Sequence, residues 1–331
     1  MNPNIHSLIQ SSLKAKEVIY QEKIQTLWSG YGEIARYNVI DGIQANVILK
    51  HVKLPEAANH PRGWNTDLSH LRKVKSYQVE SNWYQSFSEQ CGDLCRVPKC
   101  FAVEKSDTEF FILLEDLNIA GYPVRKQSAT IEDMKLCLKW LANFHAQFIN
   151  IENDYTEKLW EIGTYWHLDT RPDELKQLED LTLKNAACKI DSTLNQCQFK
   201  TLVHGDAKLA NFCFSEGGNS VAAVDFQYVG GGCGMKDIAY FIGSCLYEED
   251  CEKFEQELLD FYFIELEKAF NNYEYDLEFS LLEKEWRKMY TFAWADFHRF
   301  LKGWSPRHWK INSYSEKLTK RVIKMLEEKD I

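Results

Sequence analysis

The residues best suited to chemistry lie between positions 204 and 226. In the segment His204-Gly205-Asp206-Ala207-Lys208-Leu209-Ala210-Asn211 an Asp precedes an Asn by five residues, and Val224-Asp225-Phe226 places a second Asp fourteen positions after that Asn. One tight loop can then offer a base to a hydroxyl group and an amide oxygen to a metal ion, which the second Asp can hold from beyond a hairpin. The spacing predicts phosphoryl transfer from Mg-ATP.

The polar residues of this segment have distinct expected roles. Asp206 is the candidate base for the acceptor hydroxyl, and Lys208 is a candidate cation for the transferring phosphoryl group. Asn211 and Asp225 offer the hard oxygen ligands that Mg²⁺ prefers. We expect His204 to support the loop through hydrogen bonds. A polar turn explains the first three residues of the motif equally well, but the later residues agree independently with the catalytic interpretation.

The elements around the motif follow from local composition. Asn211–Phe214 and Val221–Asp225 read as two short strands that flank the turn-forming residues 215–220. We expect Gly230–Gly234 to form a flexible loop close to the acceptor, and whether this loop gates the site or only turns the chain stays open.

The remainder of the chain predicts an α+β fold with two lobes. The first lobe, residues 1–117, is β-rich: a helix over Ile5–Ile24 is followed by three antiparallel strands between 26 and 52. A loop over Pro55–Pro61, a helix over 68–91 and strands over Lys99–Val103 and Phe110–Leu114 complete it. The second lobe, residues 118–331, is mainly helical. In it, the stretch 131–149 has a predicted buried face made of Met134, Cys137, Leu138, Leu141, Phe144, His145 and Phe148.

The first lobe holds candidate nucleotide-binding residues. Lys50 lies on a predicted strand and Glu80 on a predicted helix, as a phosphate-binding Lys and its carboxylate partner require. Gly30 and Gly32 could let backbone amides approach phosphates, although a hairpin turn explains them nearly as well. Taken singly, Lys50 and Glu80 are also compatible with plain surface positions.

Composition limits the classes of function. The chain has 331 residues, of which 45% are hydrophobic, so it can bury a sizeable core. A net charge of −10 disfavours a nucleic-acid partner. No segment approaches the ~18 apolar residues of a membrane span. The absence of a secretory signal and the ten scattered cysteines predict a reduced cytoplasmic location, and Cys91, Cys95 and Cys100 lack zinc-site spacing and are expected to be free thiols.

The motif also carries a family resemblance. His204-Gly205-Asp206 with Asn211, Asp225-Phe226-Gln227 and Lys236-Asp237-Ile238-Ala239 resemble the aminoglycoside phosphotransferase and choline kinase superfamily, within the protein-kinase-like fold. The closest branch is the ecdysteroid-kinase-like group. The resemblance implies a two-lobed fold with ATP between the lobes, and it implies that Asp237 braces the catalytic loop from the start of a helix.

The same resemblance suggests where the two substrates bind. It implies that Glu115 and Leu117 form a hinge whose backbone holds adenine, and a simple exit from the preceding strand is the alternative. It also places the acceptor against the helical lobe, where Trp294, Asp296 and His298 are the candidate lining residues. Core packing explains most aromatic residues of that stretch by default.

The expected function is therefore an ATP- and Mg²⁺-dependent kinase that phosphorylates a hydroxyl group of a small molecule. A non-catalytic nucleotide-binding protein and a choline or ethanolamine-type kinase are the alternatives. A protein kinase fits less well because no Ala-Pro-Glu motif follows Asp225. The identity of the acceptor and the oligomeric state stay open.

Overall fold

The computed structural model describes residues 3–27, 30–54, 67–106, 108–151 and 153–328. Contacts divide the chain into two compact units. The first comprises Met1–Gly92, Arg96–Arg125 and Cys213–Gln227, and the second comprises Asp93–Cys95, Lys126–Phe212 and Tyr228–Ile331. The hairpin that leads to Asp225 thus groups with the first unit. The predicted lobe division after residue 117 stays a prediction.

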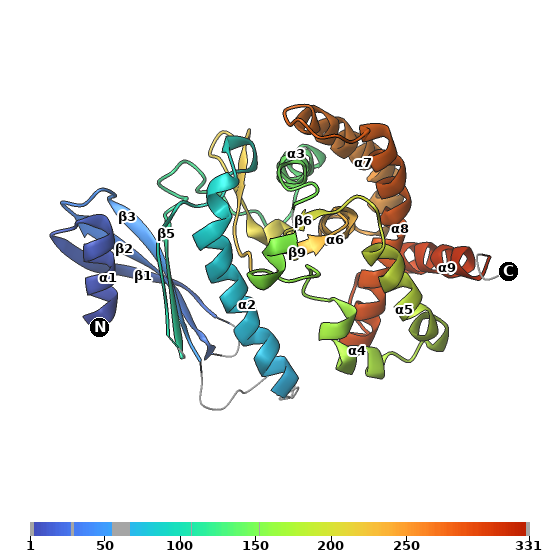
Figure 1. Ribbon diagram of the computed structural model, residues 1–331, viewed down its shortest axis with the longest axis horizontal. Helices are drawn as coiled ribbons and strands as arrows, with labels where there is room; N and C mark the ends of the chain where they lie inside the picture. The colour runs from blue at the N-terminus through green and yellow to red at the C-terminus, as the bar shows by residue number, and fades with distance from the viewer. Residues whose placement is uncertain (1–2, 28–29, 55–66, 107, 152, 329–331) are drawn as a thin grey trace. The chain divides into compact units, whose positions relative to one another are not determined.

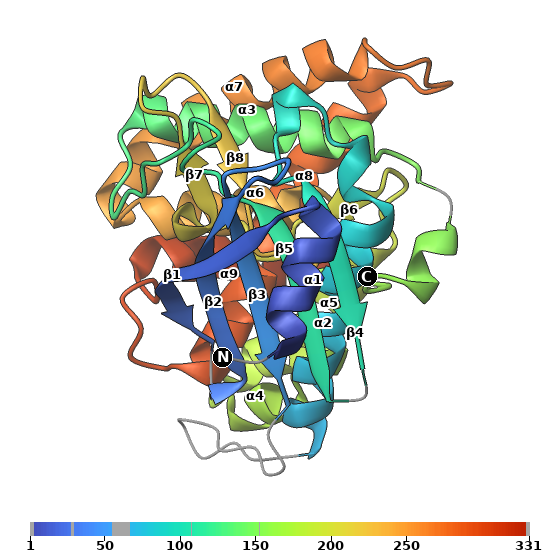
Figure 2. The same ribbon diagram turned by 90° about the vertical axis from the view of Figure 1, so that its left-hand side faces the viewer.

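The first unit is built on a five-stranded antiparallel sheet with the order β1-β2-β3-β5-β4. Its strands are β1 (Glu17–Thr26), β2 (Gly32–Ile40), β3 (Asn46–Lys53), β4 (Cys100–Lys105) and β5 (Glu109–Glu115), and its helices are α1 (Pro3–Leu13) and α2 (Asp67–Ser86). Figure 2 shows the sheet with α1 lying across one face.

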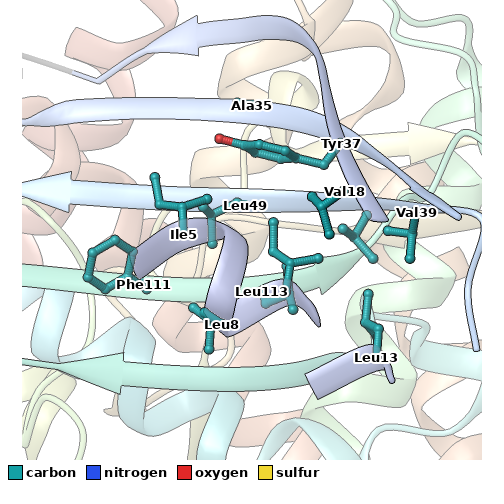
Figure 3. Close-up of a cluster of buried hydrophobic side chains, with 12 residues drawn as sticks. Ile5, Leu8, Leu13, Val18, Ala35, Tyr37, Val39, Leu49, Phe111 and Leu113 are labelled. Atoms are coloured by element: carbon teal, nitrogen blue, oxygen red, sulfur yellow. The ribbon is translucent and has the colours of Figure 1, made fainter. Parts of the chain in front are cut away.

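The core of the sheet unit lies under α1. Ile5, Leu8 and Leu13 of this helix pack on alternate residues of the strands, and Figure 3 shows them over Tyr37, Val39, Leu49 and Leu113. Along β2, Ala35, Tyr37 and Val39 are buried while the residues between them are more exposed. This period of two is the pattern expected of a strand with one covered face.

The predicted helix over Ile5–Ile24 is wrong beyond Leu13. Lys14 adopts a left-handed conformation with φ 53°, and the chain then enters β1, which pairs with β2. Val18 is the one buried residue of β1 because the strand lies at the sheet edge. Its β-branched and aromatic residues suit a strand, and pairing with β2 decides between the two readings.

The other elements of this unit follow the sequence more closely. Two of the three strands predicted between 26 and 52 are confirmed as β2 and β3, whereas the third lies earlier in the chain as β1, which ends at Thr26. The strands β4 and β5 are confirmed, and the predicted helix over 68–91 is confirmed as α2, with its end moved to Ser86. The predicted loop over 55–61 lies outside the described residues. The predicted hairpin is present as β7 (Phe212–Phe214) and β8 (Val221–Ala223), and Cys213 and Ala222 pack on Leu117.

The second unit is helical around a small two-stranded sheet. Its helices, labelled in Figure 1, are α3 (Ile131–Gln147), α4 (Pro172–Gln177), α5 (Leu181–Asn195), α6 (Met235–Cys245), α7 (Glu248–Phe270), α8 (Phe279–Trp304) and α9 (Ser313–Glu327). The helix α3 packs on α7, and α8 packs on α5, α6 and α9. The predicted buried face of α3 is confirmed. Within the described ranges, no helix is long and apolar enough to cross a membrane.

The glycine run after Asp225 is a strand, and the expected flexible loop is a wrong prediction. Gly230–Gly232 forms β9 and pairs antiparallel with β6 (Thr201–Val203). All three glycines are buried. A Cβ atom at Gly230 would collide with the carbonyl of Trp160, and one at Gly231 would collide with the hydroxyl of Tyr155. Glycine is needed here for close packing.

Candidate active site

The residues of the His-Gly-Asp motif form a buried loop in the second unit. This loop connects β6 to the short 3₁₀ turn Leu209–Asn211. The Asp206 side chain accepts three hydrogen bonds. Its Oδ1 accepts from the Tyr240 hydroxyl at 3.1 Å, and its Oδ2 accepts from Lys208 Nζ at 2.7 Å and from Asn211 Nδ2 at 3.1 Å. The carboxylate is therefore held in one orientation.

Tyr240 is a fixed hydrogen-bond donor to this carboxylate. Burial raises the pKa of Tyr240 well above its usual value, and the nearby Tyr165 and Asp206 raise it further. Its hydroxyl consequently keeps its proton near neutral pH and donates to Asp206. Tyr240 lies three residues after Asp237 on α6, which places both side chains on one side of the helix.

The backbone of the loop is braced by Asp237, which is fully buried in the first turn of α6. Its Oδ2 accepts from the amide of His204 at 2.6 Å, and its Oδ1 accepts from the amide of Gly205 at 2.9 Å. His145 Nε2 lies 3.2 Å from the same carboxylate. Gly205 has φ 79°, and a Cβ atom there would meet the carbonyl of Tyr228, so glycine is required at this turn.

Three further hydrogen bonds close the loop on itself. Asn211 Nδ2 donates to the Asp206 carbonyl at 2.8 Å, and the amide of Lys208 donates to the same carbonyl at 2.8 Å. His204 Nδ1 accepts from the amide of Asp206 at 3.3 Å. The five-residue spacing between Asp206 and Asn211 thus lets one side chain organise the other.

The first unit contains a buried cation between two carboxylates. Lys50 Nζ on β3 lies 2.6 Å from Glu80 Oε2 on α2 and 3.5 Å from Asp225 Oδ1. The side chains of Lys50 and Glu80 are 5% and 2% exposed, whereas that of Asp225 is 34% exposed. Burial alone would lower the pKa of Lys50, but the two carboxylates raise it above its ordinary value. The ammonium therefore stays charged.

The segment after the hairpin is fixed to α2. Gln227 Nε2 donates to Asp225 Oδ1 at 2.8 Å, while its Oε1 accepts from Lys73 Nζ at 3.0 Å and from Ser76 Oγ at 3.2 Å. The ring of Phe226 stacks on Trp83 with centroids 4.6 Å apart. Asp225 itself has φ 70°, a conformation that a residue other than Gly adopts only when its surroundings enforce it.

The two predicted metal ligands offer suitable oxygen atoms. Asn211 uses its amide nitrogen as a donor, so its oxygen is the atom that suits a cation, and Asp225 is partly exposed. The described part of the chain holds no group of three or more His, Cys, Asp or Glu residues suited to a metal ion. Each residue by itself offers the kind of oxygen that Mg²⁺ takes, since this ion commonly uses one or two protein ligands and completes its shell with phosphates and water. Their joint role as metal ligands stays a prediction. Asn211 belongs to the second unit and Asp225 to the first.

The other predicted nucleotide contacts lie in the first unit. Gly32 has φ 129°, and a Cβ atom there would collide with the carbonyl of His51, so the sheet itself requires this glycine. Gly30, with φ 76°, has open space around it. The amide of Glu115 donates to the Lys99 carbonyl at 2.9 Å, and the carbonyl of Leu117 accepts from the Tyr122 amide at 2.8 Å.

The three predicted acceptor-pocket residues have partners inside the helical unit. Trp294 Nε1 donates to Ser315 Oγ at 3.1 Å, and Asp296 accepts from Trp166 Nε1 at 3.0 Å and pairs with Arg299 at 2.6 Å. His298 Nδ1 lies 2.8 Å from Thr319 Oγ1, and burial lowers the pKa of His298 to about 4. Their role in binding the acceptor stays a prediction.

Sequence reasoning missed two residues close to the base. Tyr240 could have been found from its spacing after Asp237 on a predicted helix. Lys310 has no such signal. It lies in the connection between α8 and α9, and its ammonium faces the ring of Tyr240 at 5.2 Å.

Comparison with known proteins identifies the family and the fold of this chain. The model of the ecdysteroid kinase-like family matches residues 65–166 and 164–275. No curated protein matches the chain in sequence. Among solved structures, amicoumacin kinase in complex with AMP-PNP, Ca²⁺ and Ami is 16% identical, with 99% of this chain and 94% of that chain covered and a TM-score of 0.56.

Two further solved structures share the fold. Choline kinase from Cryptosporidium parvum Iowa II is 10% identical, with 99% and 96% of the two chains covered and a TM-score of 0.54. Plasmodium vivax ethanolamine kinase is 15% identical, with 91% and 81% covered and a TM-score of 0.53. These likenesses show a two-lobed, protein-kinase-like fold.

Proposed function

Because this chain belongs to the ecdysteroid kinase-like family, we propose that it transfers the γ-phosphoryl group of ATP to a hydroxyl group of a small molecule. The observation that carries the proposal is the loop of Asp206. Its carboxylate is oriented by Tyr240, Lys208 and Asn211, and the loop backbone is held by Asp237. A catalytic base needs such fixed placement beside the hydroxyl that it serves.

In this proposal Asp206 accepts the proton of the acceptor hydroxyl. The hydroxyl oxygen forms a bond to the γ-phosphorus while the bond from that phosphorus to the bridging oxygen of ADP breaks. Lys208, whose side chain is 40% exposed beside the base, offers a positive charge to the phosphoryl oxygens. Tyr240 keeps the carboxylate of Asp206 in one orientation during the transfer.

Most of the groups that bind the nucleotide in this proposal belong to the first unit. Lys50, fixed by Glu80, is positioned to pair with the phosphates, and Asp225 and Asn211 are the candidate ligands of Mg²⁺. A bound Mg²⁺ would neutralise negative charge on the phosphates during transfer. Glu115 and Leu117 remain the proposed backbone contacts of adenine, with Gly30 and Gly32 near the phosphates.

The alternative of a non-catalytic nucleotide-binding protein accounts for Lys50 and Glu80 but gives no role to the organised carboxylate of Asp206. An acceptor of the choline or ethanolamine type is compatible with every role proposed so far. Which class of acceptor alcohol binds depends on the side chains that surround Asp206.

Two measurements test the proposal. Asp206→Ala should abolish ATP consumption with a panel of alcohols, amino alcohols, sugars and sterols, while calorimetry with Mg-AMP-PNP should show unchanged nucleotide affinity. Asp169→Ala, which removes a carboxylate that is 84% exposed, serves as the matched control and should keep full activity. Substantial residual kcat in Asp206→Ala would refute its role as the base. Mg-nucleotide binding without turnover in the wild type would favour the non-catalytic alternative.

A further inference from the structure

The surroundings of Tyr240 contain a cage of aromatic rings that is filled by the protein's own cation. Lys310 Nζ lies 5.2 Å from the ring centroid of Tyr240, 5.5 Å from that of Phe297 and 5.5 Å from that of Trp309. A cation within about 6 Å of a ring face is attracted by the ring quadrupole, and cages of this kind are used to bind ammonium ligands.

The backbone on both sides of Lys310 is fixed. Its amide donates to His308 Nδ1 at 3.2 Å, and its carbonyl accepts from Ser315 Oγ at 2.9 Å. Ser315 in turn accepts from Trp294 Nε1 at 3.1 Å, and its own amide is capped by Asn312 at 3.0 Å. The start of α9 therefore holds Lys310 at the cage. Trp294, which the sequence predicted to line the acceptor pocket, helps to position Lys310 through its hydrogen bond to Ser315.

The cage is next to the base. Tyr240 forms one wall through its ring, and its hydroxyl donates to Asp206 Oδ1 at 3.1 Å. Burial lowers the pKa of Lys310 to about 8, with Asp206 opposing and Lys208 reinforcing the shift. Lys310 is thus still largely protonated at neutral pH. Its ammonium is partly desolvated and contacts aromatic rings in place of water.

We propose, on the basis of the function assigned above, that Lys310 determines acceptor specificity by occupying this cage, so that the enzyme takes uncharged or anionic alcohols and rejects cationic amino alcohols. A substrate ammonium would find the ring faces covered and would meet a like charge beside them. A hydroxyl, carbonyl or carboxylate oxygen would meet the N–H donors of Lys310 instead. Such exclusion by an unfavourable contact is a common source of specificity.

The test compares two probes of equal shape and different charge. Choline carries a quaternary nitrogen, and 3,3-dimethylbutan-1-ol carries a carbon atom in its place. In calorimetric titrations of the full chain without nucleotide, we expect Lys310→Ala to bind choline at least about tenfold more tightly than the wild type, with little change for the neutral alcohol. Lys310→Ala/Trp309→Ala should lose this gain because a wall of the opened cage is missing.

Lys317→Ala is the matched control for net charge. Lys317 lies on α9 with a side chain that is 70% exposed, so its removal changes the charge of the protein equally but leaves the cage filled. We expect it to bind both probes like the wild type. An unchanged ratio of choline affinity to neutral-alcohol affinity in Lys310→Ala overturns the inference, and so does an equal gain in Lys317→Ala.

A second measurement needs no variant. Raising the pH from 7 to 9.5 should neutralise Lys310, so choline affinity in the wild type should rise relative to the neutral alcohol. The other ionisable groups that affect Lys310 are Asp206, Lys208, Cys245 and Cys251, and burial raises the pKa of both thiols to about 12. A constant ratio across this range overturns the inference. Because the titrations involve no ATP, these results are independent of whether the chain is a kinase, which the turnover assay decides.

Discussion

Replacing Asp237 with Asn should loosen the loop that carries Asp206. The carboxylate is fully buried and accepts from two backbone amides, at 2.6 Å and 2.9 Å, with His145 at 3.2 Å. An Asn side chain of the same shape has one acceptor oxygen, and its NH₂ group would face a donor. Hydrogen bonds to a charged group contribute about 1.5–3 kcal/mol each, so the loss of one backbone hydrogen bond should destabilise the loop by about 1.5–3 kcal/mol.

Hydrogen exchange gives the most direct measurement of this change. A loss of about 1.5–3 kcal/mol corresponds to exchange that is faster by roughly one to two orders of magnitude at the amides of His204 and Gly205. The same variant should lower kcat for the proposed transfer more than it weakens affinity for Mg-AMP-PNP, because Lys50 and Glu80 belong to the other unit and only Asn211 lies next to the loosened loop.

Asp250→Asn is the matched control, since Asp250 is an exposed carboxylate in the first turn of α7. It shares with Asp237 the favourable interaction with a helix N-terminus, worth about 0.3–1 kcal/mol, but it braces no loop. If both variants exchange equally fast at His204 and Gly205, the hydrogen bonds of Asp237 do not hold the loop and the reasoning fails.

Three further predictions concern the ion pair, the Asp225 segment and Lys310. Lys50→Met should abolish nucleotide binding and destabilise the fold by about 3–5 kcal/mol because Glu80 is left buried without its partner. The double variant Lys50→Met/Glu80→Leu should regain stability in urea unfolding but still bind no nucleotide in calorimetry. Gln227→Ala should weaken Mg-nucleotide affinity by roughly tenfold through loss of its contacts with Asp225 and α2, and unchanged titrations would contradict this. The pKa of Lys310 is lowered to about 8 in the folded protein, so the unfolded chain binds more protons between pH 8 and 10.5. The wild type should therefore gain stability over that range relative to Lys310→Met. Thermal melts of both proteins at pH 7.5 and 9.5 measure this difference.

The elements that sequence predicted well are those whose pattern is local. The helix α3 has a long apolar stripe and a capping box in which Thr130 and Asp133 bond each other's backbone, and the strands β3 and β5 are rich in β-branched or aromatic residues. Part of the loop from Asp206 to Asn211 is equally local, because Lys208 and Asn211 bond to the carboxylate of Asp206 from within five residues. Such features need no knowledge of distant neighbours.

The wrong predictions share a different cause. Val18 and Ile19 fit a helical stripe as well as a strand, and pairing with β2 decides the outcome. Gly230–Gly232 has the composition of a loop, yet the backbone of Trp160 and the ring of Tyr155 approach so closely that side chains are excluded. In both places a contact between segments distant in sequence overrides the local signal.

The same distinction separates the reaction from its specificity. The groups proposed to activate the hydroxyl are positioned by a short loop and by Asp237, which the sequence motif after Asp225 already identified. The group proposed to select the acceptor, Lys310, reaches the ring of Tyr240 from the connection before α9, more than a hundred residues after Asp206 in the sequence. A chain with the same motif and a small uncharged residue at this position would present an open aromatic cage to the same base. Acceptor choice in such chains should therefore follow the residue at the cage rather than the residues of the motif, and exchanging that one side chain should move selectivity between neutral and cationic alcohols.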